Sequence, residues 1–499
     1  MRKEATAGQR FSNFIGGEWV APSTGQYSPN RNPADQDDIV GEFPVSSKVD
    51  AEAAIAAAKA AFPAWAATPG PARGRILWRA VEILRSRVDE LARTLCREEG
   101  KTFAESKGEV NKGIALFEFY AGEGFRMHGK TLPSEMRQTL TFTLRQPLGV
   151  VALITPWNFP FAIPAWKAAP ALVTGNTVVM KPASGTPATA RLLAEALHEA
   201  GLPPGVFNLV TGPGGAVGNT LVDHPEVKAV SFTGSNSVGL ALNERAAKRG
   251  IKVTCEMGGK NPVVVLGDAD LDLAVTGILQ GAYGSTGQRC TATSRVVVER
   301  ALAKTLVERL KAGAEKLRVG NGLSSDIDMG PAVDAAQLET DLEYIRIAQE
   351  EGAQLVTGGK RLTGGAFDKG FFVEPTIFTG VTPQMRIHQE EVFGPVVAVV
   401  EVSDFEEALA VANGVEFGLS SSIYTRDSNL AMKFVERSEV GMVHVNNPTV
   451  GGEAQLPFGG WKSTGVGERE MAEEGAQFFT QLKTVFYDYT GQARNSKIY

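Results

Sequence analysis

One cysteine lies in surroundings that suit covalent chemistry on a carbonyl group. Cys290 belongs to the segment YGSTGQRCTATSR, whose glycine, serine, threonine and alanine residues leave space above its sulfur. A thiolate attacks a carbonyl carbon well once its pKa is lowered, so Cys290 is a candidate nucleophile. A free cysteine is by residue type more often a small buried residue, and this segment alone leaves both interpretations open.

The other cysteines and the histidines do not indicate disulfide or metal chemistry. Cys96 lies within a helical pattern, and three cysteines are an odd number in a long chain, so we expect reduced thiols rather than a disulfide framework. The five histidines are scattered, and no two cysteines stand at CxxC spacing. We therefore expect no bound metal.

The composition is typical of a soluble protein with more than one domain. The chain has 499 residues, 43% of them hydrophobic and 21% charged, with a formal net charge of -6. It has no basic tracts, so we expect neither nucleic acid nor an anionic membrane as a partner. The N-terminus lacks the apolar region of a signal peptide, and prolines interrupt the longest apolar stretch, from Val150, before it reaches spanning length. We expect a cytoplasmic location.

The hydrophobic patterns predict an α/β fold with two parallel sheets. Amphipathic helices are predicted over 49–101 and about 104–120. From 149 to 259, β-branched segments such as GVVALIT, NTVVMKP and KAVSFTG alternate with helical segments, which is the pattern of a parallel sheet covered on both faces. A second alternating series runs from NPVVVLG at Asn261 to GMVHVN. We expect the first series to bind a nucleotide.

Two glycine-rich turns are candidates for holding a pyrophosphate. TGPGGAVG, at Thr211, is weak evidence, because a lone glycine-rich turn is more often a plain loop. FTGSNSVG, at Phe232, connects a predicted strand directly to a predicted helix, so its backbone N–H groups are well placed for an anion. The first series can therefore bind a dinucleotide without the usual GxGxxG fingerprint.

Four segments in order give the chain a family resemblance. They are PWNFP at Pro156, CEMGGKNP at Cys255, GQRC at Gly287 and EEVFGPV at Glu390, accompanied by Lys181, FTGS and PFGG. With these spacings the chain resembles the aldehyde dehydrogenase superfamily from about residue 14 to 489. GEVNKGIALFEFYAGEG, STGQRCTATSR and VNNPTVGGEAQLPFGG look most like bacterial enzymes that oxidise 2-oxoglutarate semialdehyde (2,5-dioxovalerate).

The resemblance implies a complete catalytic set. Cys290 would form a thiohemiacetal with an aldehyde, and Asn158 with the backbone N–H of Cys290 would stabilise the oxyanion. Hydride would pass to C4 of a nicotinamide, and Glu256 would activate the water that hydrolyses the thioester, so the product would be a free carboxylic acid. Lys167 completes the set. Asn158 as a plain turn residue and Glu256 as a turn cap are the alternatives.

The resemblance also implies the cofactor contacts. Lys181 and Ser184 would meet the adenosine ribose, and Glu391 and Phe393 the nicotinamide ribose. Strongly NAD-preferring members often have a glutamate in place of Ser184, which would repel a 2'-phosphate. We therefore expect the site to accept NADP, alongside NAD or in preference to it. The full cofactor set is Thr155, Pro156, Trp157, Lys181, Ser184, Gly214, Phe232, Gly234, Ser235, Gly239, Met257, Gly258, Glu391 and Phe393.

The substrate positions are less determined. They are Lys112, Phe159, Trp166, Arg289, Thr291 and Phe458. The aromatic members would line a tunnel, and Trp166 stands where members specific for succinate semialdehyde commonly have arginine, which disfavours a short semialdehyde. Lys112 or Arg289 would meet a distal carboxylate, although a solvated lysine and a structural ion pair are strong alternatives.

We expect a nucleotide-binding domain (1–128 and 147–258), a catalytic domain (259–460) and a β-strand arm (129–146 and 478–494). The tail from Phe478 alternates and has no later partner strand, so we expect the arm to pair with another subunit in a homodimer or homotetramer. Alternatives are an aromatic or aliphatic aldehyde dehydrogenase, favoured by the aromatic tunnel and Gly452, and a cofactor-independent cysteine hydrolase, disfavoured because no histidine lies near Cys290.

Overall fold

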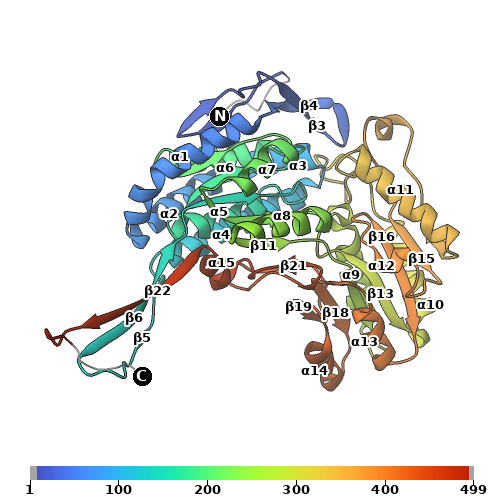
Figure 1. The fold of residues 1–499 in the computed structure, drawn as a ribbon. Coiled ribbons are helices and arrows are strands. Elements are labelled where there is room, and N and C mark those ends of the chain that lie inside the picture. The colour runs from blue at the N-terminus through green and yellow to red at the C-terminus, as the bar shows by residue number, and fades with distance from the viewer. Residues whose placement is uncertain (1–7, 494–499) are drawn as a thin grey trace.

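In the computed structural model, which describes residues 8–493, the chain forms two α/β lobes and a projecting arm (Figure 1). Residues 1–7 and 494, at the ends of the expected first domain and arm, lie outside the described residues. The first lobe begins with the hairpin β1 (Asn13–Ile15) and β2 (Glu18–Val20) and the ribbon β3 (Tyr27–Asn32) and β4 (Asp35–Pro44). The predicted amphipathic helices follow as α1 (Lys48–Ala67), α2 (Gly70–Ser86), α3 (Val88–Glu99) and α4 (Phe103–Glu123).

The first sheet has the strand order β2-β1-β9-β8-β7-β10-β11-β21. Its five central strands are parallel, as the alternating pattern predicts. Alternate residues of one strand reach opposite cores: Val150 and Ala152 pack with α1, whereas Val151 and Leu153 pack with helices α2 to α6. The strands and helices are β7 (Val150–Ile154), α5 (Ala162–Val173), β8 (Thr177–Lys181), α6 (Ala188–Glu199), β9 (Phe207–Leu209), α7 (Asn219–Asp223), β10 (Val227–Thr233), α8 (Asn236–Arg249), β11 (Lys252–Glu256) and β21 (Gly465–Val466).

The second sheet has the order β14-β15-β16-β13-β12-β18-β19 and is parallel except for β14. Helices α9 and α10 cover one face, and α11 and α13 the other. The predicted strand FFVEPTIF is divided in two: its end forms β15 in the sheet, and before Pro375, which cannot donate to a ladder, Val373 makes only an isolated bridge with Arg361. The elements are β12 (Asn261–Val265), α9 (Leu271–Tyr283), β13 (Thr293–Glu299), α10 (Arg300–Ala314), α11 (Ala335–Glu350), β14 (Gln354–Thr357), β15 (Thr376–Thr379), α12 (Arg386–Gln389), β16 (Val396–Val402), α13 (Phe405–Asn413), β17 (Phe417–Gly418), β18 (Ser420–Tyr424), α14 (Ser428–Arg437), β19 (Met442–Val445), β20 (Trp461–Lys462) and α15 (Ala472–Phe478).

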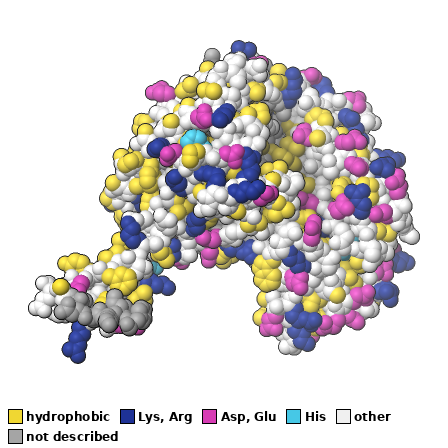
Figure 2. Space-filling model, in the orientation of Figure 1, with side chains coloured by type: hydrophobic (Ala, Val, Ile, Leu, Met, Phe, Trp, Pro, Cys, Tyr) yellow, Lys and Arg dark blue, Asp and Glu magenta, His cyan; other side chains and the backbone are white. Residues whose placement is uncertain are grey.

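The arm contains the tail strand that has no later partner in the sequence. Strand β22 (Thr480–Asp488) pairs antiparallel with β6 (Thr139–Pro147) of the same chain, and β5 (Thr131–Leu132) continues the sheet. The tail pairs backwards along the chain, and β22 is left as an edge strand of the arm. Hydrophobic side chains are exposed on this arm, and yellow atoms gather there at the lower left of Figure 2. The most exposed of them are Leu482, Phe486, Tyr487 and Tyr489.

Charged side chains of both signs are interspersed over the face shown in Figure 2. Among residues 8–493, no helix is long and apolar enough to cross a membrane. Within the same range, histidine, cysteine and acidic side chains form no group of three that would hold a metal ion.

Candidate active site

Cys290 lies on a tightly constrained loop that leads into β13. The short 3-10 turn η2 (Gly284–Gly287) precedes it, and a side chain at Gly287 would collide with the carbonyl oxygen of Gly394, 2.2 Å from an added Cβ. The side-chain amide of Asn261 donates to the carbonyl oxygens of Cys290, at 2.8 Å, and Ala292, at 2.9 Å. The loop is therefore fixed on both sides of the sulfur.

The Cys290 thiol is protonated at neutral pH in the free protein. Burial first, and then the Glu391 and Glu256 carboxylates, raise its pKa to about 12, against the opposing effect of the backbone N–H groups of Thr291 and Cys290. Cys96 and Cys255 are almost fully buried and have similarly raised pKa values of about 12. Cys290 differs from them because it is partly exposed and lines a pocket.

Asn158 brings an amide donor to the loop of Cys290. It follows β7, is only 4% exposed, and donates from Nδ2 to the carbonyl oxygen of Gln288 at 3.2 Å. Its own carbonyl oxygen accepts a hydrogen bond of 2.7 Å from Lys101 Nζ. The side-chain amide of Asn158 therefore contacts the backbone two residues before Cys290. An oxyanion formed by attack of Cys290 needs a donor in this region.

Glu256 is a buried carboxyl group at the end of β11. It is 4% exposed, and its Oε2 has no hydrogen-bond partner in the described chain. Its pKa is raised well above the usual value, first by burial and then by the Glu470 carboxylate, although Lys167 and Arg469 oppose this. The base form therefore becomes more populated as the pH rises.

Lys167 lies near Glu256 and is paired with Glu470, a residue that the sequence did not reveal as part of the site. On α5, Lys167 forms a buried ion pair with Glu470 Oε1 and also donates to Ser231 Oγ at 2.8 Å. The other oxygen of Glu470 accepts from Trp166 Nε1 at 2.8 Å. Glu470 lies more than 300 residues from Lys167 in a short charged segment, and nothing in that segment marks it as part of the site.

The turn between β10 and α8 has the features of a nucleotide site. Ser235 precedes α8, and a Cβ at Gly239 would lie 2.5 Å from Met257 Sδ, so the helix can approach only as glycine. Gly258 N–H donates to Asn236 at 3.0 Å, and Glu391 Oε1 accepts from Gly259 at 2.8 Å. Burial raises the pKa of Glu391 to about 7.

Buried donor groups on β8 and β10 fit an anionic ligand. Lys181 is 5% exposed, and among residues 8–493 its only hydrogen bond is to the carbonyl of its neighbour Pro182, at 2.7 Å. Burial lowers its pKa to about 8. The hydroxyls of Thr155 and Thr233 are buried without partners among the described residues. Ser184 is exposed and donates to Gly212 at 3.0 Å, and Gly214 lies in the exposed π-helical turn η1 (Gly214–Gly218), which is not a plain loop.

A pocket of about 380 Å³ opens beside Cys290. All the substrate positions expected from the sequence line it: Lys112, Phe159, Trp166, Arg289, Thr291 and Phe458. The Trp166 and Phe458 rings pack with centroids 5.2 Å apart and form an aromatic wall. Arg289 is paired with Glu105 at 3.1 Å and with Ser285 Oγ at 3.1 Å, so the structural alternative for Arg289 is present.

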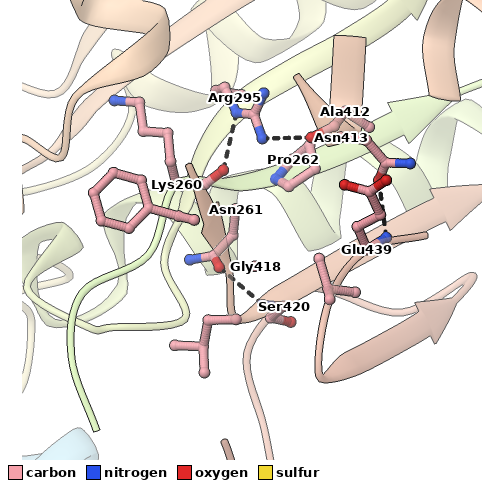
Figure 3. Close-up of a pocket in the computed structure, with 12 residues that line it drawn as sticks. Lys260, Asn261, Pro262, Arg295, Ala412, Asn413, Gly418, Ser420 and Glu439 are labelled. Atoms are coloured by element: carbon pink, nitrogen blue, oxygen red, sulfur yellow. Dashed lines mark hydrogen bonds between the residues drawn. The ribbon is translucent and has the colours of Figure 1, made fainter. Parts of the chain in front are cut away.

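A second cavity, shown in Figure 3, is structural. The buried Arg295 lies on β13 and donates to the carbonyl oxygens of Lys260, at 2.9 Å, and Ala412, at 2.9 Å. Asn261 accepts from Ser420 N–H at 3.1 Å, and the cavity has no space for a water molecule. These contacts connect β12, β18 and α13 to the loop that carries Cys290.

The sequence matches the family model "Aldehyde dehydrogenase family" over residues 19–485. It is 47% identical over 476 residues, 95% of this chain and 98% of the relative, to the alpha-ketoglutaric semialdehyde dehydrogenase of Bacillus subtilis (strain 168). The chain belongs to the aldehyde dehydrogenase family.

Solved structures of other aldehyde dehydrogenases agree with this fold. Betaine aldehyde dehydrogenase from Staphylococcus aureus in complex with NAD+ has a TM-score of 0.94 at 34% identity, covering 98% of this chain and 96% of that one. An E. coli NADP dependent enzyme has a TM-score of 0.93 at 38% identity, covering 96% and 98%. The predicted α/β class and family are confirmed, and the protein is an NAD(P)-dependent oxidoreductase of aldehydes.

The structure of this aldehyde dehydrogenase brings the four expected catalytic residues to one place from two lobes. It adds three residues that the sequence analysis missed, Glu470, Asn261 and Glu105. Asn261 lies within the CEMGGKNP motif, which was its only available signal. Glu105 and Glu470 act through contacts across 184 and 303 residues and had none.

The raised pKa predicts slow alkylation of Cys290 in the free enzyme. Below the pKa, the thiolate fraction and hence the rate with iodoacetamide should rise about tenfold per pH unit, without a plateau between about pH 7 and 10. Peptide mapping should place the label on Cys290 before Cys96 or Cys255, and Cys290→Ala serves as the control. A plateau near neutral pH would contradict the burial of this thiol.

Proposed function

We propose that this aldehyde dehydrogenase oxidises 2-oxoglutarate semialdehyde to 2-oxoglutarate. The observation that carries the proposal is the pocket beside Cys290, which combines an aromatic wall with Lys112, a partly buried lysine that bonds to a backbone carbonyl and to no carboxylate within residues 8–493. The Bacillus subtilis relative, which bears the name of this activity, supports the same substrate.

In the proposed mechanism, Cys290 loses its thiol proton to water, the sulfur adds to the aldehyde carbon, and the carbonyl electron pair moves onto the oxygen. The Asn158 amide and the Cys290 backbone N–H stabilise the oxyanion of the thiohemiacetal. A nicotinamide cofactor bound beside Cys290 would supply the hydride acceptor, and Cys290 would then hold the acyl group as a thioester. Glu256 takes a proton from water, the hydroxide adds to the thioester, and the Cys290 thiolate leaves with release of the free acid.

Cofactor binding is assigned to the turn between β10 and α8. We assign the pyrophosphate to the start of α8, where Gly239 leaves room, and the nicotinamide ribose to Glu391 and Phe393. The Phe393 ring lies edge-on to Trp157, with ring centroids 5.4 Å apart. Lys181 is assigned to the adenosine ribose.

Lys112 is the better anchor for the distal carboxylate. Its Nζ donates to the carbonyl oxygen of Gly452 across the pocket, and burial lowers its pKa to about 8, although Glu453 opposes this. Below that pH the ammonium is charged, and an incoming carboxylate would favour the charged form further. Arg289 is already compensated by Glu105, so it contributes less.

Replacing Lys112 by alanine should therefore change specificity. We expect kcat/KM for 2-oxoglutarate semialdehyde to fall about 10–100-fold, since one charge-assisted hydrogen bond contributes about 1.5–3 kcal/mol, while benzaldehyde turnover changes little. For the wild type, KM for the semialdehyde should rise as the pH passes above 8.

The matched control for Lys112→Ala is Lys107→Ala. Lys107 lies on the same helix but is exposed and pairs with Asp89 at 2.8 Å. Equal losses for the acidic and the neutral aldehyde in Lys112→Ala would contradict the anchor. Preference of the wild type for benzaldehyde over the semialdehyde would instead support an aromatic substrate.

We propose that NADP is the preferred cofactor. Two residues support this. Within residues 8–493, the buried Lys181 ammonium is bonded only to a carbonyl, and Ser184, three residues later, exposes a short neutral side chain. A 2'-phosphate would supply the anion that Lys181 lacks.

Introducing a carboxylate at position 184 should reverse this preference. In Ser184→Glu, the ratio of kcat/KM for NADP to that for NAD should fall about tenfold or more, because the carboxylate repels the phosphate and accepts from a ribose hydroxyl. Ser184→Gln has the same length without charge and should shift the ratio little. An equal shift in both variants would show that size, not charge, controls the choice.

We propose that the arm forms a contact between subunits of a homo-oligomer. Its edge strand β22 exposes Leu482 and Phe486 by 59% and 67%, which is unfavourable for a free monomer. In light scattering, Leu482→Ser/Phe486→Ser should lower the molar mass by at least half. The control is Leu273→Ser, which alters a 54% exposed leucine outside the arm. An unchanged mass of the arm variant would contradict the assignment.

A further inference from the structure

Helix α4 contacts both halves of the catalytic site through two carboxylates one turn apart. Glu105 Oε1 accepts from Ser285 N–H at 2.6 Å and from Arg289 at 3.1 Å, on the loop that carries Cys290. Glu109 faces the other half, the turn that carries Asn158. The oxyanion site requires the loop with Cys290 and the turn with Asn158. Both are therefore contacted by residues one helical turn apart on α4.

Lys101 connects Glu109 to Asn158. The side chains of Lys101 and Glu109 are each 1% exposed, and Lys101 Nζ lies 2.7 Å from Glu109 Oε2. Lys101 Nζ also lies 3.7 Å from Glu99 Oε1. The same Nζ donates to the Asn158 carbonyl oxygen at 2.7 Å and lies 4.0 Å from the centre of the Phe159 ring. The ammonium thus contacts the backbone of the oxyanion residue and a wall of the pocket.

The second carboxylate oxygen of Glu109 holds the end of the turn that carries Asn158. Glu109 Oε1 accepts from the N–H groups of Phe161, at 2.9 Å, and Ala162, at 3.1 Å, where α5 begins. The ion pair therefore contacts the turn at its start, at Asn158, and at its end. In a low-dielectric interior such bonds are short and directional, so they fix the backbone from which the Asn158 amide projects.

We infer that Lys101 and Glu109 are positioning residues for the oxyanion site. Their ion pair orients the backbone of Asn158 so that its side-chain amide meets the oxygen of the thiohemiacetal on Cys290. They do not contact the reacting atoms, and their effect passes through Asn158. The inference rests on the proposed role of Asn158.

The chain contains a matched control for a purely structural carboxylate. Glu98 is 1% exposed and accepts from the N–H groups of Ala188, at 2.7 Å, and Thr189, at 2.9 Å, at the start of α6. This repeats the contacts of Glu109 at the start of α5, but no catalytic residue lies in that turn. Glu98→Gln should lower the melting temperature without changing the rate of hydride transfer.

The test is a double-mutant cycle read by single-turnover formation of NADPH. Lys101→Met/Glu109→Gln removes both charges of the 2.7 Å pair, and Glu99 keeps the backbone N–H of residue 101 as its donor. The double variant is made with and without Asn158→Ala. With Asn158 present we expect the rate to fall about tenfold or more, and in Asn158→Ala by less than about twofold, because the effect acts through the missing amide. The Kd for NADP should not change.

The possible results are distinguishable. The same loss in both backgrounds, or an equal loss in Glu98→Gln, would overturn the positioning role. A normal rate in Asn158→Ala alone would overturn the proposed oxyanion role and the inference with it. If the double variant does not fold, Glu109→Gln alone retains an acceptor for the two amides and should show the same pattern with a smaller factor.

Discussion

The site depends on keeping ionisable groups out of water where two parallel sheets meet. The buried groups include the thiol of Cys290, the carboxyl of Glu256 and the ammonium of Lys181, and burial is the largest cause of the pKa shift of each. Desolvation shifts the pKa of each of them toward its uncharged form, and an opposite charge placed beside the group would counter that shift. In the free enzyme the Cys290 thiol is therefore protonated and poorly reactive. Its reactivity depends on the cofactor and the substrate that bind beside it.

Much of this arrangement could be predicted from sequence, because it resides in short contiguous segments. Strand and helix periods indicate both sheets, and the motifs around Asn158, Glu256 and Cys290 each lie at the end of a strand or on the loop before one. The strands of one sheet align their ends, so such residues converge without any knowledge of side-chain contacts.

The parts that could not be predicted depend on partners distant in the chain. The sequence does not determine whether Arg289 contacts a substrate or forms an ion pair, because its partner Glu105 is distant in the chain. Lys167 needs Glu470, and the tail strand pairs with β6, more than 300 residues earlier. Short-range periodicity contains no information on which buried charges neutralise each other.

The most direct test of the account is the mass of the covalent intermediate. Glu256→Gln enzyme is mixed with 2-oxoglutarate semialdehyde and NADP, quenched in acid and digested for mass spectrometry. The account predicts that the peptide containing Cys290 gains the mass of the 2-oxoglutaryl group, and that omitting NADP abolishes the adduct. An acyl group on another residue, or none while NADPH is still formed, would contradict it.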